Sequence, residues 1–511
     1  MVDVATDEQG LVQSDDIPED PVLHNPDLEP TAAEDRTWDK WNLAALWVGM
    51  SVCIPTFLLA GSLIKMGMNW WQATLTVLLG NLIVLVPLVL NGHAGTKYGI
   101  PFPVFARASF GVFGAHVPSI ARALVASGWF GIQCFVGGEA ILQMIKAVWP
   151  GFATIGANLG VFAGLPGFWM KEGVLQFLWL DPASWICFML FWFMNMFFVW
   201  EGHESIKWLE NLAAPLLLLA GLGTLGWAAW QVGGVGILLG KSVEVAAAKT
   251  DVSGLAWLGS IFLPGLTAVV GFWATLSLNI PDFTRFCRTQ RDQMEGQAFG
   301  LPTTMVFFSF VAIMIASASL ILFDETIVNP ADLVDKIPAG SGYALLIFFL
   351  SFIIVIATLS TNIAANVVAP ANSYSNAFPK RISFRMGGVI TGVLGIVILP
   401  WKVMDVLTGF LVSYSGVLGP IGGILVADYW LLRGTDLEVA ELYRSDGKFR
   451  YDGGFNWRAI GALALGMAVV LAGKLHASIG FLFQGAWFTG FGTAFVAYWF
   501  LMKDRIEERV G

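Results

Sequence analysis

Two stretches of this chain, WVGMSVCIPTF at residues 47–57 and WATLSLNIPDF at residues 273–283, share the pattern W-x-x-x-S-x-x-I-P-x-F. They lie 226 positions apart, agree at five of eleven positions, and both fall inside long apolar segments. Proline lacks the N–H that a continuing helix needs. Paired breaks at corresponding positions of two halves are typical of the binding site of a secondary transporter. The repeat therefore predicts a transporter built from two related halves.

The composition is that of a membrane protein. Of the 511 residues, 56% are hydrophobic and only 13% are charged, whereas a soluble domain carries about twice that charged fraction. The 57 Gly and 22 Trp suit a helix bundle in a bilayer, because small residues let helices approach closely and Trp favours the interfaces. We therefore expect an all-α integral membrane protein surrounded by lipid.

The first 36 residues are acidic and lack the basic start and apolar core of a cleaved signal peptide. This composition predicts a disordered acidic cytoplasmic tail over residues 1–36. The four cysteines form no CxxC pair, which argues against a disulfide framework and a cysteine metal site. No basic patch with interleaved aromatic residues indicates nucleic acid as a partner, and we expect no cofactor.

Apolar segments of about 20 residues, the length that crosses a bilayer, recur along the chain. We expect twelve membrane-spanning helices, at residues 42–64, 72–92, 117–148, 183–201, 207–232, 256–280, 299–323, 341–368, 385–401, 403–432, 457–475 and 479–502. An even number of spans puts both termini on the same side of the membrane.

The basic residues indicate which side that is. If the N-terminus is cytoplasmic, the outer segments hold lysines but no arginine, namely Lys65, Lys146, Lys171, Lys241, Lys249, Lys336, Lys402 and Lys474. The other Lys and Arg lie in inner segments, apart from Arg122 at the inner end of the third helix. Cytoplasmic loops carry the excess of Lys and Arg. We therefore expect a protein of the cytoplasmic membrane with both termini inside the cell.

The offset of 226 residues equates the first predicted helix with the sixth. Because five helices form the first unit (residues 37–232), the second unit (residues 250–432) is inverted in the membrane. Residues 457–502 add two C-terminal helices, and residues 503–511 form a cytoplasmic tail. The prediction is a five-plus-five inverted repeat with two further helices. Residues 151–181 are an insertion that either caps the outer face or extends a loop.

The two proline-containing helices are expected to break near residues 49–52 and 275–277. Unwound backbone at mid-bilayer must line a cavity or bury against protein, and freed carbonyls can coordinate a cation. The eighth helix supplies oxygen donors in ATLSTNIAAN, residues 357–366. The adjacent hydroxyls of Ser360 and Thr361 suit a sodium-sized cation. The alternative is that each hydroxyl bonds back to its own helix.

Aromatic and amide side chains suited to a planar ring occur in the third, sixth and eighth helices. Trp129 and Gln133 are four residues apart and share a helix face, as do Asn362 and Asn366. Trp129 and Trp273 can stack on the two faces of a planar ring, while Gln133 and Asn366 bind its amide edge. The alternative is that each Trp only packs or lies at the membrane interface.

Other functions would leave different traces in the sequence. Glu139, an acid in the third helix, is a candidate for proton coupling or a structural partner. An amino-acid carrier of the same architecture would need to capture a zwitterion, and an amine or betaine carrier would use an aromatic cage. A metalloenzyme would show a spacing such as HExxH, whereas the five His are dispersed. A channel would lack saturable, cation-driven accumulation, so we expect a transporter and not an enzyme.

The chain closely resembles the nucleobase-cation-symport-one family, which includes bacterial hydantoin, allantoin, uracil and cytosine permeases. The resemblance runs from about Trp41 to Leu501 and is carried by WFGIQ (129–133), NIPDFTRF (279–286), STNIAAN (360–366) and LGPIGGILVADYWLLR (418–433). It implies the leucine-transporter fold and symport of a planar heterocycle with a cation by alternating access. We also expect a monomer.

The resemblance assigns roles to individual residues. The family's sodium–hydantoin member holds its substrate between two Trp that match Trp129 and Trp273, and binds its edge with groups that match Gln133 and Asn366. Its sodium ligands look like Gly49, Val52, Ala357, Ser360 and Thr361.

Two departures from the hydantoin carrier bear on the substrate. Cys53 stands where that carrier has Gln, and Phe272 stands where it has Gly. NIPDFTRF looks more like the allantoin and uracil branch, and the bulk of Phe272 favours a smaller ligand such as allantoin or a pyrimidine base. With Asn362, these residues complete the predicted substrate site. Sodium is the favoured coupling ion because the hydroxyl pair is intact, and a proton is the alternative.

Overall fold

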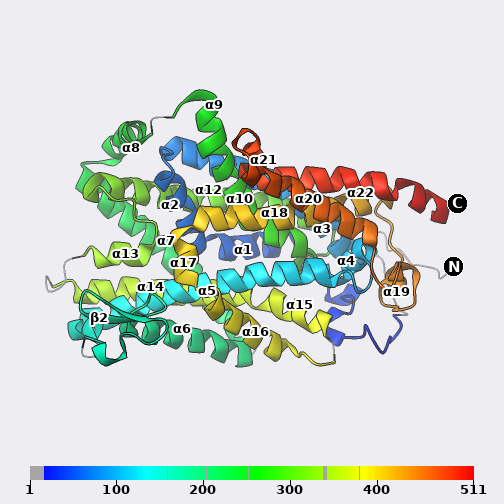
Figure 1. Ribbon diagram of the computed structural model, residues 1–511, viewed down its shortest axis with the longest axis horizontal. Coiled ribbons are helices and arrows are strands. Elements are labelled where there is room, and N and C mark those ends of the chain that lie inside the picture. The colour runs from blue at the N-terminus through cyan, green and yellow to red at the C-terminus, as the bar shows by residue number, and fades with distance from the viewer. Residues whose placement is uncertain are drawn as a thin grey trace.

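The computed structural model describes residues 17–157, 159–201, 204–250, 252–337, 342–378 and 380–510. Within these ranges the protein is a bundle of long helices with one small hairpin at its edge (Figure 1). The prediction of an all-α fold is therefore confirmed for the body of the molecule.

The helices of the body are α1 (Lys40–Ser51), α2 (Ile54–Lys65), α3 (Trp70–Tyr98), α5 (His116–Val148), α6 (Pro182–Glu201), α7 (Glu204–Val232), α10 (Leu263–Asn279), α12 (Gln290–Phe323), α14 (Ala344–Asn366), α15 (Val368–Ala377), α16 (Phe384–Val397), α18 (Leu407–Val426), α20 (Trp457–Leu475) and α22 (Ala486–Val510). Shorter helices connect them: α4 (Phe102–Phe110), α8 (Val235–Lys249), α9 (Gly254–Trp257), α11 (Pro281–Thr284), α13 (Pro330–Asp335), α17 (Pro400–Asp405), α19 (Val439–Leu442) and α21 (Phe481–Gln484). Two π-helical turns, η5 (Leu258–Phe262) and η6 (Ala427–Leu432), precede α10 and follow α18.

Each of the twelve predicted spans coincides with a helix or a helix pair. Among the described residues, nine helices are long and apolar enough to cross a membrane, or up to ten if the bent pair α1–α2 is one span. Helix α16 is apolar but shorter, so the number twelve stays a prediction. The predicted tail at residues 503–511 instead continues α22 as far as Val510, and Gly511 lies outside the described residues.

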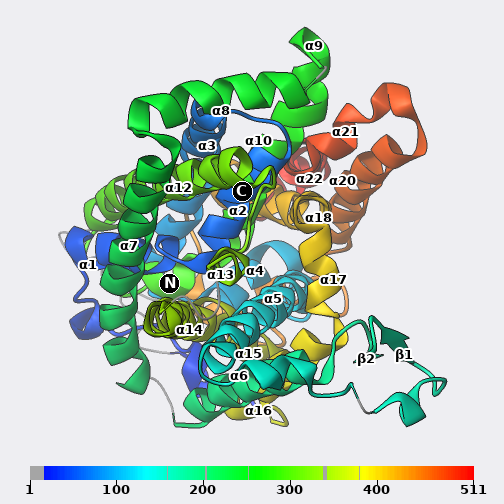
Figure 2. The same cartoon turned by 90° about the vertical axis from the view of Figure 1, so that its left-hand side faces the viewer.

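The long helices form two groups with a broken helix between them. Helix α5 packs against α6, α14 and α16, while α12 packs against α1, α2 and α3, and α3 also packs against α10. Figure 2 looks along the helices and shows the α5 group below and the α12 group above. Helices α1 and α2 contact both α12 and α14. The groups therefore meet at the break between α1 and α2.

The first copy of the repeated motif breaks its helix. Helix α1 ends at Ser51 and α2 begins at Ile54, with a bend of 59° and an extended Cys53 (φ −147°, ψ 161°) between them. Pro55 has no N–H for the Ser51 carbonyl, which instead accepts the Cys53 N–H at 3.0 Å. In a continuous helix that N–H would bond to Gly49. The break thus lies at the end of the predicted range and releases the Gly49 carbonyl.

The second copy does not break where predicted. Helix α10 is continuous through residues 275–277 and ends at Asn279, and α11 follows at Pro281. Pro281 leaves the Ser277 carbonyl without its helical donor, and the side chain of Asn91 supplies one, with Nδ2 2.7 Å from that oxygen. Because a neighbouring helix satisfies the carbonyl, the chain has no need to unwind there.

The predicted disorder of the N-terminal tail is wrong for residues 17–36. Leu23 and Leu28 are buried, and η1 (Pro26–Leu28) and η2 (Ala33–Asp35) form there. The Tyr443 hydroxyl donates to the Leu28 carbonyl at 2.6 Å, and Asp20 accepts the Ser445 N–H at 2.7 Å. A few apolar residues among many acids are enough to fix this segment on the surface. Residues 1–16 lie outside the described residues.

The insertion at residues 151–181 contains a β-hairpin, with residue 158 outside the described residues. Strand β1 (Phe168–Lys171) pairs antiparallel with β2 (Val174–Phe177), after η3 (Pro150–Thr154) and η4 (Gly160–Phe162). The rings of Phe168 and Phe177 stack at 4.4 Å. Figure 2 shows the hairpin beyond the edge of the helix bundle, so the hairpin extends a loop and does not cover the end of the bundle.

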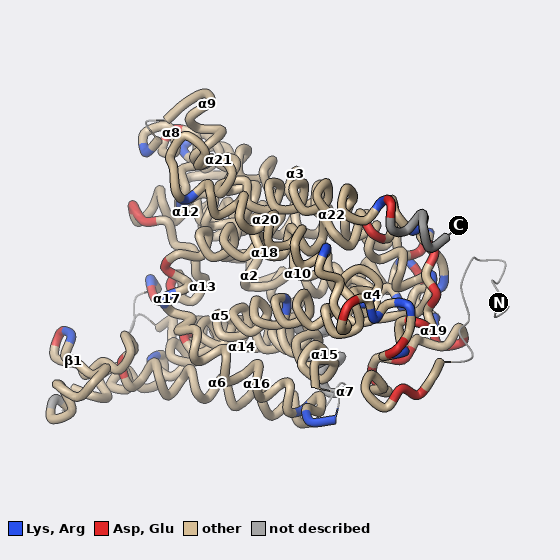
Figure 3. The backbone as a smooth tube through the Cα atoms, turned by 45° about the vertical axis from the view of Figure 1, so that its right-hand side comes forward, with Lys and Arg blue, Asp and Glu red and all other residues tan. Residues whose placement is uncertain are grey.

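Charged residues concentrate at the end of the molecule that holds α4, α19 and the C-terminal part of α22 (Figure 3). The first described residues lie at this same end (Figure 1). There Arg433 Nε lies 2.8 Å from Asp428, which also accepts the Tyr498 hydroxyl at 2.8 Å. Burial opposes the charge of Arg433, but the Asp428 carboxylate outweighs it and holds the pKa of Arg433 above its usual value. The hydrogen bond from Tyr498 to Asp428 fixes η6, at the end of α18, against α22.

We predict that Gly300→Ala destabilises the protein because Gly300 lets α12 pack closely on α1. A Cβ there would lie 2.8 Å from Trp47 Cβ and 2.9 Å from Ala44 Cα, and overpacking of this kind costs about 1–3 kcal/mol. The measurement is the melting temperature of purified protein. The control is Gly461→Ala in α20. Apart from its chain neighbours and its own helix backbone, an added Cβ there would have no described atom within 4 Å, so the melting temperature should stay equal or rise. Equal melting of the two variants would contradict the prediction.

Candidate functional site

An aromatic cluster joins α1, α5, α10 and α18. The ring of Phe272 contacts Trp129 edge-to-face at 5.3 Å and Trp273 at 4.9 Å. On its other side Trp273 contacts Trp47 at 5.1 Å, also edge-to-face. All four side chains are buried. The structure thus brings Trp129 and Trp273 to one site, with the phenyl ring of Phe272 against both.

Amide side chains form a hydrogen-bonded ladder beside Trp129. Asn366 Nδ2 donates to Asn362 Oδ1 at 3.1 Å, and Asn362 Nδ2 donates to Asn195 Oδ1 of α6 at 3.1 Å. Asn362 Nδ2 also lies 3.3 Å from the Phe130 carbonyl of α5. Asn362 therefore uses its polar atoms within the protein and orients Asn366.

Several buried polar atoms of the cluster lack a partner among the described residues. They include Gln133 Oε1, Trp273 Nε1, Trp47 Nε1 and Ser51 Oγ. Buried polar groups in proteins are nearly always hydrogen-bonded, because an unpaired one costs about 1–3 kcal/mol. An acceptor at Gln133 and donors at the two indoles are the groups a polar heterocycle would satisfy.

The candidate cation ligands lie at the break of the first helix and on α14, and these helices contact one another. Val52, Ala357, Ser360 and Thr361 are buried, and α14 contacts both α1 and α2. Thr361 Oγ1 donates to the Ala357 carbonyl at 3.0 Å. That bond uses the hydroxyl proton and leaves the oxygen lone pairs free, so back-bonding to the helix does not exclude a cation. Together with the released Gly49 carbonyl, these groups offer the hard oxygens that sodium requires.

Cys53 takes part in the break itself. Its side chain is buried, and its sulfur lies 3.3 Å from Thr56 Oγ1, which in turn lies 3.6 Å from the Met305 sulfur of α12. Cys53 is therefore linked to α12 through Thr56.

Sequence reasoning missed several residues of this cluster. Trp47 is the counterpart of Trp273 in the repeated motif, and the repeat is the signal that points to it. Asn195 and Tyr414 lie in apolar runs without a motif. A polar side chain inside an apolar span indicates a hydrogen-bond partner elsewhere in the protein. The sequence does not identify that partner, because it depends on the fold.

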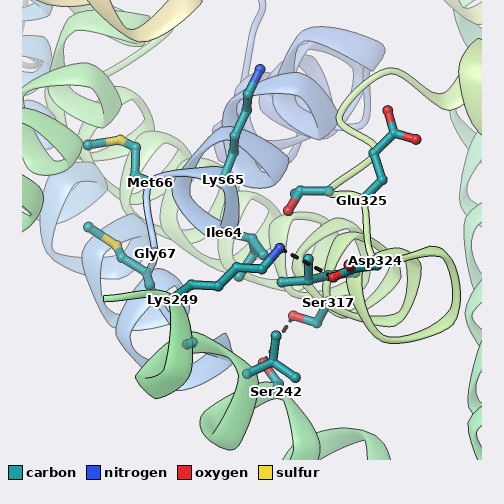
Figure 4. A pocket seen from close by; sticks show the side chains of 14 residues that line it. Ile64, Lys65, Met66, Gly67, Ser242, Lys249, Ser317, Asp324 and Glu325 are labelled. Atoms are coloured by element: carbon teal, nitrogen blue, oxygen red, sulfur yellow. Dashed lines mark hydrogen bonds and ion pairs between the residues drawn. The ribbon is translucent and has the colours of Figure 1, made fainter. Parts of the chain in front are cut away.

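A separate cavity of about 510 Å³ is drawn from close by in Figure 4. The helices α2 and α8, which help to line it, end on the side of the molecule opposite the C-terminus (Figure 1). Its walls come from α2, α8 and α12, and it includes none of the predicted site residues. Lys249 lies 3.7 Å from Asp324, and Glu325 pairs with Lys336 at 2.9 Å. Lys249, Asp324 and Glu325 are thus paired within the protein, and Lys65 is a further charged residue of the cavity wall.

The family is decided by sequence comparison. A family described as "Permease for cytosine/purines, uracil, thiamine, allantoin" matches residues 30–491. The purine-uracil permease NCS1 of Arabidopsis thaliana is 40% identical over 502 residues, covering 95% of this chain and 78% of that protein. The allantoin permease of Bacillus subtilis is 37% identical over 484 residues, covering 94% of this chain and 93% of that protein. This chain belongs to that permease family.

The permease is thus a multi-pass membrane transporter, and its relatives are permeases and not enzymes, as predicted. The inward-facing conformation of Mhp1 matches its structure with a TM-score of 0.75 and 24% identity, covering 96% of both chains. At that identity the likeness shows the fold alone. It confirms the expected leucine-transporter architecture.

We predict that Asn195→Leu destabilises the permease because it removes the acceptor of one of the two Asn362 Nδ2 N–H groups and leaves only the Phe130 carbonyl, at a cost of about 1–3 kcal/mol. The control is Asn81→Leu. Both residues are buried and donate to the carbonyl four residues earlier, Asn195 to Phe191 and Asn81 to Val77. Only Asn81 Oδ1 lacks a partner among the described residues. The melting temperature of purified protein should fall for Asn195→Leu and not for Asn81→Leu. An equal fall for both variants would show that the amide ladder adds nothing to stability.

Proposed function

We propose that this permease is a symporter of the cytoplasmic membrane that carries a small planar heterocycle into the cell together with a cation. Allantoin and uracil are the favoured substrates, and sodium is the favoured ion. The observation that carries the proposal is the set of unpaired polar atoms on Gln133 and Trp273 beside the aromatic cluster. In the proposed orientation both termini face the cytoplasm.

The substrate ring would stack on Trp129 and Trp273. Gln133 would accept a ring N–H, and Asn366 would bind a ring carbonyl or N–H at the opposite edge. Asn362 would position Asn366. Among the described residues, the contacts of the cluster involve aromatic and amide groups but no charged side chain, which suits a neutral heterocycle better than a zwitterion or an amine. The phenyl ring of Phe272 limits the room between the two indoles and supports a small ligand.

The cation would bind between the Gly49 and Val52 carbonyls of the broken helix and Ala357, Ser360 and Thr361 of α14. The bond from Thr361 to the Ala357 carbonyl orients the hydroxyl lone pairs away from that carbonyl. A proton is the alternative coupling ion. Glu139 on α5 is its candidate carrier, since it is an ionisable side chain partly buried within a predicted span.

Transport would proceed by rocking of the α5 group against the α12 group. At the end nearer the termini, Arg122 Nε of α5 donates to Asn279 Oδ1 of α10 at 3.1 Å. Asn279 in turn donates to Asp282 at 3.2 Å, and Asp282 accepts the Phe102 N–H at 2.8 Å. These bonds join the two groups below the site, so they would have to break before substrate leaves on that side. Coupling further requires that cation and substrate bind the two states differently.

We predict that Trp129→Ala weakens heterocycle binding by roughly 5- to 150-fold, since stacking on an aromatic side chain is worth about 1–3 kcal/mol per base. The measurement is equilibrium binding of labelled allantoin and uracil to purified permease. Trp487→Ala on α22, also a buried indole, is the control and should bind normally. Unchanged affinity of folded Trp129→Ala would refute the site. If the unmodified protein binds neither compound but binds choline or an amino acid, the proposed substrate class is wrong.

We predict that Thr361→Val raises the sodium concentration needed for half-maximal substrate binding by at least about tenfold, because an ion loses one oxygen ligand while the side-chain shape is kept. Thr391→Val is the matched control. Thr391 is also buried and donates to the carbonyl four residues earlier, but it lies on α16. Binding is titrated with sodium at fixed pH. A sodium response that Thr361→Val leaves intact would exclude this cation site, and a response to pH alone would favour proton coupling.

A further inference from the structure

Tyr414 of α18 links the two helices that supply the proposed stacking residues. It is buried, and its hydroxyl lies 2.9 Å from the Gly271 carbonyl of α10 and 3.3 Å from Trp129 Nε1 of α5. Helices α5 and α10 belong to different groups of the bundle. One hydroxyl therefore bridges both sides of the site.

The direction of the two hydrogen bonds follows from the chemistry of the groups. An indole N–H can only donate, so the Tyr414 oxygen must accept from Trp129. A carbonyl can only accept, so the one proton of Tyr414 must go to Gly271. Among the described residues, the indole N–H of Trp129 thus has a partner in the protein, whereas those of Trp47 and Trp273 have none. Trp129 therefore offers a ligand its ring face and not its N–H.

The packing around Tyr414 restricts the Trp129 ring further. Phe410, one turn earlier on α18, contacts Tyr414 at 5.0 Å and Trp129 at 6.2 Å. Gly271 has no side chain, and a Cβ there would collide with Ser415 Oγ. This close approach of α18 to α10 brings the Gly271 carbonyl within reach of the hydroxyl.

We propose that Tyr414 is a positioning residue of the substrate site. Its hydroxyl ties Trp129 to the α10 backbone and fixes the plane of the indole against which the heterocycle stacks. Tyr414 acts through Trp129 and makes no hydrogen bond to the substrate. The inference rests on the proposed function and adds a residue to its site.

The test is Tyr414→Phe, which removes the hydroxyl and keeps the ring. Equilibrium binding of labelled allantoin and uracil should weaken about 3- to 10-fold, the size expected for one hydrogen bond. The control is Tyr374→Phe, because Tyr374 is also buried and its hydroxyl lies 3.4 Å from Ser127 Oγ of the same helix α5. It should bind as the unmodified protein does. Equal affinity of folded Tyr414→Phe and unmodified protein would overturn the proposal.

A double-mutant cycle separates positioning from direct contact. Trp129→Phe keeps an aromatic face but has no N–H to donate. In the Trp129→Phe background, Tyr414→Phe should weaken substrate binding by less than a further factor of two. If it costs as much as in the unmodified protein, Tyr414 contacts the substrate itself and the proposal is wrong.

A spectroscopic measurement needs no Tyr414 variant. The ultraviolet resonance Raman difference between unmodified and Trp129→Phe protein isolates the Trp129 indole. Its N–H band should have the position of a hydrogen-bonded indole; the position of a free indole would overturn the proposal. Failure of the proposed function is distinguishable, since then the unmodified permease binds neither allantoin nor uracil while the Raman result can still hold.

Discussion

The structure depends on one constraint: backbone N–H and C=O groups inside a membrane must find partners within the protein, because the bilayer core holds no water. Proline removes a donor and so leaves a carbonyl to be satisfied. At Pro55 the chain turns sharply, and the Ser51 carbonyl accepts the Cys53 N–H. Near Pro281 the backbone stays helical as far as Asn279, with Ile280 also in the αR region, because Asn91 donates to the Ser277 carbonyl. Two similar sequences thus give one broken and one continuous helix.

This difference decides where each kind of ligand group is available. The broken helix leaves main-chain oxygens without helical donors, and its two parts, α1 and α2, contact both α14 and α12. The continuous helix presents its side chains instead, and Phe272 and Trp273 face the neighbouring helices with their rings. A cation would be held mainly by backbone, and an aromatic ligand by side chains. The first half of the repeat therefore offers backbone carbonyls to a ligand, whereas the second half offers aromatic side chains.

Hydrogen bonds from the amide ladder and from Tyr414 both hold α5, the helix that carries Trp129. Asn362 joins α14 to α5 and α6 by hydrogen bonds, and Tyr414 joins α5 to α10. Polar groups that would be costly in lipid are used here to set the distances between helices that carry the site. The Asn362 bonds lie within the α5 group, whereas the Tyr414 bonds run from α5 to α10 and so join the two groups.

The sequence by itself determined the membrane class, the helical body, the family and the residue types of the site, because hydropathy, helical spacing and the repeated motif are local patterns. It placed Trp129, Gln133, Trp273 and Asn366 as candidates. Only the tertiary structure decided that α10 stays continuous, that residues 17–36 are ordered, and that Asn195, Trp47 and Tyr414 complete the cluster. The physical reason is that each of these depends on which distant group supplies a hydrogen bond or a packing surface, and a chain pattern does not record that partner.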